Sequence, residues 1–490
     1  MPDAPVTTAT PARSPALRRL AGVGVALVLA AAGLAWVEAS AEAPRLPAAT
    51  PQARCQGPDD RLETGRQGRV PLSDYASGRF RRGYQCNTVQ VAQQGGSGGF
   101  KVLRYRDRTG RVCAYYDSTL LFPRDVLFNA TQGLGVVVLD MTNPSKPRKT
   151  AQLTSTAMLS PHESLLVNQR RGILAAVLGN PATNVGVVDL YDVRTDCRHP
   201  RLLSSSRKAA FGHESGFSPD GRTFWVAGAA GKNLTAVDIC KPREPRKIFE
   251  QSSVNYHGLR FSKNGRTMYV ANLGTQQGPV EVVGLRILDV SAIQDRRRDP
   301  RVRVVSDLTW GTVSLPQVAE PFTRGGRPYL LEVDEYADFS GDQSVGAARI
   351  IDIADPRRPK VVSDLRLSVH QPAHRQSQLL DPGAAVPVQG YAGHYCSVPY
   401  PTNPRIVACS MIASGLRLFD ISNLEKPREI GYFNRPILLG SKTLNPTALG
   451  AFAMSQPAWD VKRRQVWYSD GNSGFYVVGL RGGVGRLLRR

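Results

Sequence analysis

Several common active-site signatures are missing from this sequence. Its 7 cysteines include no Cys-x-x-Cys pair, so the usual spacing of zinc ligands is absent. The glycine-rich stretch 95–99 is not followed by a helical pattern, which argues against a phosphate-binding loop. No Gly-x-Ser-x-Gly motif lies in a strand–turn–helix context, which argues against a serine hydrolase.

Acidic residues are also scarce, with 40 Asp and Glu against 63 Lys and Arg and a net charge of +23. A field of that sign favours anionic partners. The basic residues are scattered, many in turns such as Asp295–Arg303, and aromatic residues do not interleave with them as a base-stacking platform requires. We therefore expect a solvated, arginine-rich, monomeric protein that does not bind nucleic acid. Its expected partner is an anionic envelope polymer or a protein.

The N-terminus carries an apolar run from Leu20 to Trp36, preceded by arginines and followed by small residues. That order is typical of a secretory signal. The run is near the lower limit for spanning a bilayer, so an uncleaved anchor is the alternative to cleavage. We predict an extracellular protein, or one at the outer face of the cytoplasmic membrane, that contacts a membrane only through this segment. The expected division is 1–43 signal peptide or signal anchor, 44–85 linker or N-terminal extension, and 86–490 folded domain.

Export would expose the cysteines to an oxidising compartment, where disulfides persist. Two cysteines flank a proline-rich turn, two enclose the N-terminal segment, and two follow matching strands in successive repeats. The candidate pairs are Cys396–Cys409, Cys55–Cys86 and Cys197–Cys240, which leaves Cys113 alone. Connectivity is not fixed by spacing, so these pairs are hypotheses.

Seven segments resemble one another, each a short apolar run that in six cases ends in Asp. They are Gly133-Leu-Gly-Val-Val-Val-Leu-Asp140, Val185-Gly-Val-Val-Asp189, Leu234-Thr-Ala-Val-Asp238, Gly284-Leu-Arg-Ile-Leu-Asp289, Ala348-Arg-Ile-Ile-Asp352, Gly415-Leu-Arg-Leu-Phe-Asp420 and Gly474-Phe-Tyr-Val-Val478. Such β-branched runs favour strands, and a spacing of roughly fifty residues is typical of propellers or arrays. The Asp is expected to cap the following turn.

The flanks of these runs supply three more strands per repeat. A proline-containing turn and another strand follow the Asp, while Asp-Gly or Asn-Gly hairpins such as Ser218–Val226 and Ser262–Val270 precede the run. Four short strands at a regular period, with no convincing helix, predict an all-β fold, a β-propeller of about seven four-stranded blades. We expect the ring to close through N-terminal strands near Phe100–Arg104 and Val112–Tyr116.

The repeats resemble the LVIVD-repeat family of extracellular β-propellers. The resemblance is carried by Gly284–Asp289, Gly415–Asp420 and Ala348–Asp352 and extends over about Gly98 to Leu480. It implies the architecture and a secreted or surface location, and says little about function. More distantly, the layout is similar to the selenium-binding and methanethiol-oxidase propellers, in which channel histidines hold a metal. Those ligands are not matched residue by residue here.

Four of the 7 histidines share one repeat position, just before or at the start of the innermost strand: His162, His213, His257 and His394. Inner strands line the central channel, so residues at this position are expected to converge on its mouth. The other three, His199, His370 and His374, lie in turns and are expected to have no specific role.

Carboxylates accompany these histidines: Glu163 and Glu214 follow two of them directly. In the repeat after that of His257, Gln317 falls near the position that the histidines occupy in their repeats. Glu332, Asp334 and Glu335 lie on the next strand of that repeat. Imidazoles with carboxylates suit copper, zinc or iron. The metal hypothesis therefore names His162, His213, His257, His394, Glu163, Glu214 and Glu335. The alternative is that His-Glu-Ser closes the turn between blades by hydrogen bonds.

Two functions stay open from the sequence, and a third reading is a charge-driven binder of cell wall or nucleic acid, whose affinity would fall steeply with salt. The first is a binding or scaffold propeller for an envelope or extracellular ligand. The second is a metal-dependent enzyme, an oxidoreductase or hydrolase, centred on the four histidines.

Overall fold

A computed structural model describes residues 47–119, 134–180, 185–229, 232–274, 282–336, 345–384, 389–438 and 449–489. All of them belong to one compact unit, Leu46–Arg490. The expected signal or anchor segment, 1–43, lies outside the described residues, as does Gly133 of the first repeat.

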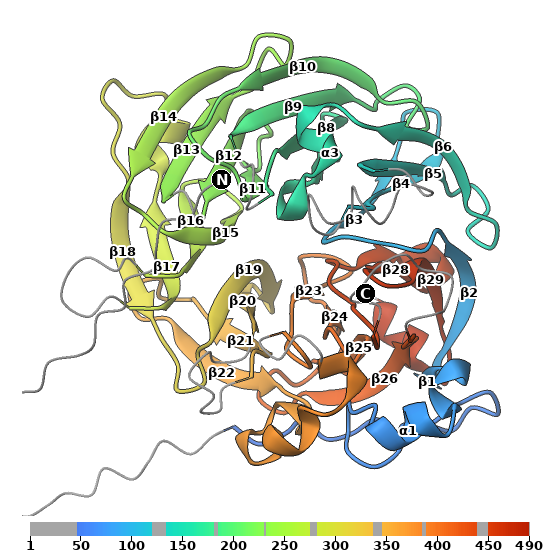
Figure 1. The fold of residues 1–490 in the computed structure, drawn as a ribbon. Helices are drawn as coiled ribbons and strands as arrows, with labels where there is room; N and C mark the ends of the chain where they lie inside the picture. The colour runs from blue at the N-terminus through green and yellow to red at the C-terminus, as the bar shows by residue number, and fades with distance from the viewer. Residues whose placement is uncertain are drawn as a thin grey trace, which may run out of the picture. The chain divides into compact units, whose positions relative to one another are not determined.

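Seven antiparallel sheets surround a common axis, which confirms the propeller of seven blades (Figure 1). Blades 1 to 5 each consist of four consecutive strands, ordered from the axis outward. Blade 1 holds β3 (Val102–Arg106), β4 (Val112–Asp117), β5 (Val136–Asp140) and β6 (Arg148–Leu153). Blade 2 holds β7 (Leu166–Asn168), β8 (Ile173–Val177), β9 (Val187–Asp192) and β10 (Arg201–Arg207). Blade 3 holds β11 (Glu214–Phe217), β12 (Thr223–Gly228), β13 (Asn233–Asp238) and β14 (Arg246–Ser252).

The other four blades continue the ring. Blade 4 holds β15 (Tyr256–Phe261), β16 (Thr267–Asn272), β17 (Gly284–Asp289) and β18 (Arg303–Leu308). Blade 5 holds β19 (Leu315–Arg324), β20 (Arg327–Glu335), β21 (Ala348–Asp352) and β22 (Lys360–Leu365). Blade 6 holds β23 (Tyr395–Ser397), β24 (Ile406–Ser410), β25 (Leu416–Asp420) and β26 (Arg428–Asn434). Blade 7 starts with β27 (Ala458–Asp460), β28 (Gln465–Asp470) and β29 (Gly474–Leu480).

Over the ranges that the structure describes, the helices are short one-turn segments. The α-helices are α1 (Leu72–Ala76), α3 (Thr156–Leu159) and α4 (Ser291–Gln294). The 3₁₀ turns are η1 (Arg79–Arg82), η2 (His162–Ser164), η3 (Ser368–His370), η4 (Pro372–His374), η5 (Gln376–Gln378), η6 (Pro382–Ala384), η7 (Val461–Arg463) and η8 (Val484–Leu488). Within the described residues, no helix has the length and apolar character needed to cross a membrane.

An N-terminal strand closes the ring, as expected, but it is not one of the strands the sequence indicated. β2 (Thr88–Gln94) pairs antiparallel with β29 and is the outer strand of blade 7. β1 (Tyr84–Cys86) pairs with β26 and adds a fifth strand to blade 6. The strands expected to close the ring, Phe100–Arg104 and Val112–Tyr116, instead correspond to β3 and β4, the two inner strands of blade 1. All residues of β4 are buried inside blade 1, whereas β3 is only partly buried.

The repeated Asp run is the third strand of each blade, and its Asp caps the next turn. Asp140, Asp289 and Asp420 each accept the backbone N–H of the residue two positions later, at 2.8 to 2.9 Å. Blade 2 differs from the expectation because Asp192, not Asp189, has this role and accepts the N–H of Arg194. Asp189 is fully buried and accepts backbone N–H groups at the start of α3.

Each blade is buried between two neighbours, which explains why its middle strands are apolar on both faces. All residues of β12, β24 and β28 are buried. Trp225 of β12, for example, packs in one cluster with Phe261 and Met268 of the next blade. This face-to-face burial stabilises the ring because no blade covers its own apolar surface.

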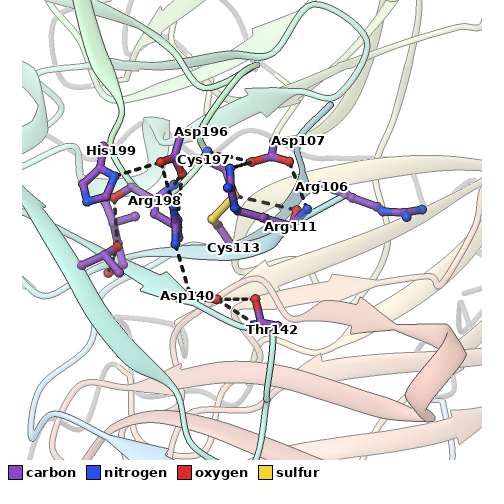
Figure 2. Close-up of a disulfide and its surroundings, with 12 residues drawn as sticks. Arg106, Asp107, Arg111, Cys113, Asp140, Thr142, Asp196, Cys197, Arg198 and His199 are labelled. Atoms are coloured by element: carbon purple, nitrogen blue, oxygen red, sulfur yellow. Dashed lines mark hydrogen bonds and ion pairs between the residues drawn. A yellow bond between two sulfur atoms is a disulfide. The ribbon is translucent and has the colours of Figure 1, made fainter. Parts of the chain in front are cut away.

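Three disulfides form, two of them as predicted: Cys55–Cys86 and Cys396–Cys409. The predicted Cys197–Cys240 pair is wrong, because Cys197 bonds to Cys113 and Cys240 is free (Figure 2). The turn after β9 leans back onto blade 1 rather than forward onto blade 3. The N–H of Cys197 donates to Asp107 Oδ2 at 3.2 Å, and the Tyr115 hydroxyl donates to the carbonyl of Cys197 at 2.9 Å.

The segment before β1 is an extension that packs on blade 6. Glu63 is buried against Arg417, whose guanidinium also lies 3.0 Å from Glu429. Cys55–Cys86 ties the segment to β1. Three disulfides are typical of proteins that fold in an oxidising compartment.

Candidate functional site

The four repeated histidines lie where the sequence predicted, at the start of the inner strands. His213 precedes β11, His394 precedes β23, His257 is the second residue of β15, and His162 opens η2 just before β7. All four are nearly inaccessible, at 8% exposure or less. The inner strands converge on the axis (Figure 1), and histidines far apart in sequence are in contact there.

Backbone carbonyls set the tautomer of two of these imidazoles. His257 Nδ1 lies 3.2 Å from the carbonyl oxygen of Gln317, and His394 Nδ1 is hydrogen-bonded to the carbonyl of Met454. A carbonyl can only accept, so each Nδ1 carries a hydrogen. The Nε2 atoms of both rings therefore point into the cluster, the arrangement usual for metal-ligating histidines.

Three donor atoms form a tight triangle on the axis. His213 Nε2 lies 2.8 Å from His257 Nε2. Glu163 Oε2 lies 3.4 Å from the first nitrogen and 3.2 Å from the second. Ligands bound to one ion at about 2.0–2.2 Å, with angles between 90° and tetrahedral, are separated by about 2.8–3.6 Å. The triangle thus has the dimensions of one face of a metal coordination sphere.

Glu335 and His394 extend the triangle. His394 Nε2 lies 3.1 Å from Glu163 Oε1 and 3.2 Å from Glu335 Oε2. The other oxygen of Glu335 lies 3.6 Å from His257 Nε2. The cluster therefore gathers three imidazoles and two carboxylates from blades 2, 3, 4, 5 and 6.

Several buried atoms of this cluster lack a normal hydrogen bond. Glu163 Oε2, His394 Nε2 and His213 Nδ1 have no hydrogen-bond partner of acceptable geometry among the described residues. Burying polar atoms without partners costs roughly 1–3 kcal/mol each, more when they are charged. A cation bound between them would satisfy the two atoms that face the cluster, Glu163 Oε2 and His394 Nε2.

The electrostatics of the cluster favour bound positive charge. Burial opposes the charged form of His257 and His394, yet Glu163 and its neighbours raise the pKa of both rings to about 9. Burial likewise opposes ionisation of Glu163, but the surrounding imidazoles hold the pKa of its carboxyl well below its usual range. In the absence of a metal, protons would supply the positive charge that the carboxylates attract.

His162 belongs to the cluster differently from the other three histidines. Its ring packs between Phe100, at 4.2 Å between centroids, and His213, at 4.6 Å. Burial, reinforced by the charge of His213, holds the pKa of His162 well below its usual value. Its backbone φ is +52°, a strained conformation for a non-glycine residue that often marks functional sites.

Glu214 lies behind the cluster rather than in it. Its Oε2 is 3.5 Å from His257 Nδ1, on the side of the ring away from His213. Its Oε1 lies 3.2 Å from Lys101 Nζ and 3.3 Å from Arg260 Nη1. Blades 4 and 5 approach closely here, and the contact is possible because residue 258 is glycine. A Cβ on Gly258 would lie 2.8 Å from Glu214 Oε2 and 2.3 Å from the carbonyl of Gln317. Glu214 therefore orients His257 rather than binding an ion.

A second polar layer closes the channel beneath Glu214. Arg260 Nε lies 2.8 Å from Glu320 Oε2, and Gln456 approaches both Lys101 and Arg260 at 3.5 Å. Glu320 and Gln456 also line a cavity of about 370 Å³, together with residues of the inner strands β3, β7, β23 and β27. Sequence reasoning missed Lys101, Arg260 and Gln456. The sequence did contain a signal for two of them: Lys101 and Gln456 lie just before inner strands, the same repeat position as the histidines.

Two of the acidic residues on β20 point elsewhere. Glu332 and Asp334 are ion-paired with the buried guanidinium of Arg349 on β21, while Glu335 alone reaches the histidines. His370, one of the histidines expected to be inert, is a structural residue: its Nδ1 accepts the N–H of Leu367 and its Nε2 donates to the carbonyl of Tyr391.

Two of the groups of candidate metal ligands in the described residues overlap in this cluster. His162, Glu163 and His213 form one, and Glu163, His257 and Glu335 form the other, with donor atoms within 4.8 Å of one another in each group. Glu163 is common to both.

Comparisons with known proteins indicate only the fold. No family model matches this chain, and no curated protein sequence matches it. Among solved structures, the chain is similar to the β-propeller domain of Cps50 from Myceliophteria thermophila, with 12% identity, 80% of this chain and 98% of that chain covered, and a TM-score of 0.46. It is also similar to a putative 6-phosphogluconolactonase from Bacteroides fragilis (11% identity, 71% and 90% covered, TM-score 0.45). A third similar structure is the hydrazine synthase of Kuenenia stuttgartiensis (12% identity, 80% and 98% covered, TM-score 0.46).

Proposed function

We propose that this chain is an exported metal-dependent enzyme, a hydrolase or oxidoreductase, whose active centre is a divalent transition-metal site on the propeller axis. The observation that carries the proposal is the triangle of His213 Nε2, His257 Nε2 and Glu163 Oε2, with sides of 2.8, 3.2 and 3.4 Å. The two inward-facing imidazole nitrogens, 2.8 Å apart, and the carboxylate oxygen are close enough together to bind one metal ion. A metal ion bound there would also satisfy the carboxylate.

The donor set narrows the class of ion. Imidazoles and carboxylates without sulfur suit zinc, iron or divalent copper, and disfavour the soft monovalent copper that thiolates and thioethers select. A bound ion of this kind activates water or polarises a substrate oxygen. The remaining residues have supporting roles: Glu214 and the carbonyl of Gln317 orient His257, and the carbonyl of Met454 orients His394.

Export is part of the proposal. The disulfides are typical of an oxidising compartment, and the N-terminal sequence has the order of a secretory signal. The repeats resemble those of LVIVD propellers, which supports a secreted or surface location.

Metal analysis of the purified mature protein tests the proposal. We expect a stoichiometric transition metal that is lost in His213→Ala and in His257→Ala. His199→Ala is the matched control, because the ring of His199 is exposed and pairs only with Asp196 in the described residues. Wild-type protein that takes up no metal from zinc, iron or copper solutions would refute the proposal.

A binding or scaffold function is the second candidate. The cavity of about 370 Å³ lined by residues of the inner strands supports it, because this cavity combines Arg104 and Glu320 with the indole of Trp459. A chain without metal, in which both histidine variants fold and retain an envelope ligand, would favour this alternative.

A further inference from the structure

We propose that the axial site holds two divalent cations bridged by Glu163 and Glu335, rather than one. This inference rests on the proposed function, since it assumes that the cluster binds metal. It follows from the positions of the carboxylate oxygens: in each carboxylate, one oxygen lies near one group of histidines and the other oxygen lies near a different histidine.

The first cation position is the triangle already described. His213 Nε2, His257 Nε2 and Glu163 Oε2 surround it, and Glu335 Oε1 lies 3.6 Å from His257 Nε2 on the same side. Two nitrogens and two oxygens would thus hold this ion. The number and type of donors match those of a four-coordinate borderline metal.

The second position lies between His394 and the remaining carboxylate oxygens. His394 Nε2 is 3.1 Å from Glu163 Oε1 and 3.2 Å from Glu335 Oε2. The Nδ1 atom of His394 is held by a backbone carbonyl, so Nε2 is the ring nitrogen that faces these oxygens. His394 Nε2 is fully buried and has no hydrogen-bond partner of acceptable geometry in the part of the chain that the structure describes.

Gln317 supplies a fourth donor to the second position. Its amide nitrogen lies 2.6 Å from Glu163 Oε1, while its own buried Oε1 has no hydrogen-bond partner among the described residues. The nitrogen and oxygen of an amide are assigned from the hydrogen bonds around them. A cation between Glu163 Oε1 and His394 would reverse the amide, so that its oxygen becomes a ligand. The second position is therefore richer in oxygen than the first.

One ion does not account for both sets of contacts. Each carboxylate presents one oxygen to His257 and the other to His394, which is the arrangement of a bridging carboxylate. His394 is not hydrogen-bonded to either of the other imidazoles within the described residues, whereas His213 and His257 are in direct contact. Bridged pairs of ions in two-metal sites are separated by about 3.5–4 Å, a distance that two such carboxylates span.

Titration of the metal-free mature protein with manganese alone, and separately with zinc alone, tests this inference. We expect two equivalents per chain for wild type and for His199→Ala, and one equivalent for His394→Ala and for the milder His394→Gln. We also expect the electron paramagnetic resonance spectrum of the dimanganese form to show exchange coupling, which the His394 variants lose. Circular dichroism establishes that each variant is folded.

The outcomes separate the inference from the function on which it rests. A single equivalent in wild type, with an uncoupled manganese spectrum, overturns the two-ion site and leaves the metal-dependent function intact. No equivalent in wild type overturns both. A folded His394→Gln protein that still binds two coupled ions also overturns the inference, because the second position would then not depend on His394.

Discussion

The buried Lys101, near the cluster of histidines and carboxylates, leads to a prediction of how stability depends on pH. Lys101 is fully buried, with its ammonium 3.2 Å from Glu214 Oε1 and 3.7 Å from the centroid of the Tyr395 ring. Burial lowers the pKa of Lys101 to about 8, although Glu214 opposes the shift. An unfolded lysine titrates near about 10.4. Between these two values the unfolded chain binds more protons, so stability rises with pH.

The magnitude follows from the two pKa values. From pH 7 to pH 9 the folded protein gains about 1.3 kcal/mol from Lys101, relative to a chain without this titrating group. Lys101→Met removes the group while keeping an apolar side chain of similar length. We therefore expect the free energy of unfolding of wild type, minus that of Lys101→Met, to increase by about 1.3 kcal/mol over this pH interval.

Urea unfolding followed by tryptophan fluorescence, in EDTA at pH 7, 8 and 9, measures this difference. Lys247→Met is the control, since Lys247 is exposed and pairs with Glu250 at the surface. We expect its difference from wild type to be the same at each pH. A constant difference for Lys101→Met as well would show that the ammonium is not held in the buried, charge-paired state from which the prediction is derived.

Three further changes test other parts of the structure. Burial, with the charge of a nearby arginine, lowers the pKa of His370 to about 3, so below pH 6.5 the unfolded chain binds more protons and stability is lost. The free energy of unfolding of wild type should thus fall by about 2 kcal/mol more than that of His370→Gln between pH 7.5 and pH 5, as measured by urea unfolding at each pH. The double variant Cys113→Ser/Cys197→Ser opens a loop of 84 residues and should lower the free energy of unfolding by about 4 kcal/mol; an unchanged denaturation midpoint would contradict this. Gly258→Ala should weaken zinc binding at least about 10-fold, because its Cβ would lie 2.3 Å from the carbonyl of Gln317, and isothermal titration of the folded variant measures it.

The local pattern of the chain was enough to predict the blades. Six apolar runs closed by Asp, with Asp-Gly or Asn-Gly hairpins before some of them, indicated strand order and number because turns and strands depend on neighbouring residues. The hairpin at Gly221 forms as expected, with its N–H donated to the carbonyl of Ser218 and its φ at +69°. The shared repeat position of the four histidines placed them correctly at the axis for the same reason.

Contacts between distant parts of the chain could not be predicted in this way. β2 rather than β3 closes the ring, and Cys197 bonds to Cys113 rather than Cys240, because both outcomes depend on how neighbouring blades lean on one another. Runs of similar composition give no local signal that distinguishes these partners.

Which charged residue contacts which partner could also be known only from the folded ring. Glu335 reaches the histidines while Glu332 faces Arg349, since successive side chains of a strand alternate between its two faces. Lys101 meets Glu214 only because blades 1 and 3 converge on the same axis. The sequence by itself thus determined the repeat and the positions of the histidines within it. Which carboxylates contact these histidines was decided by closure of the ring, because only closure brings the inner strands of all seven blades together.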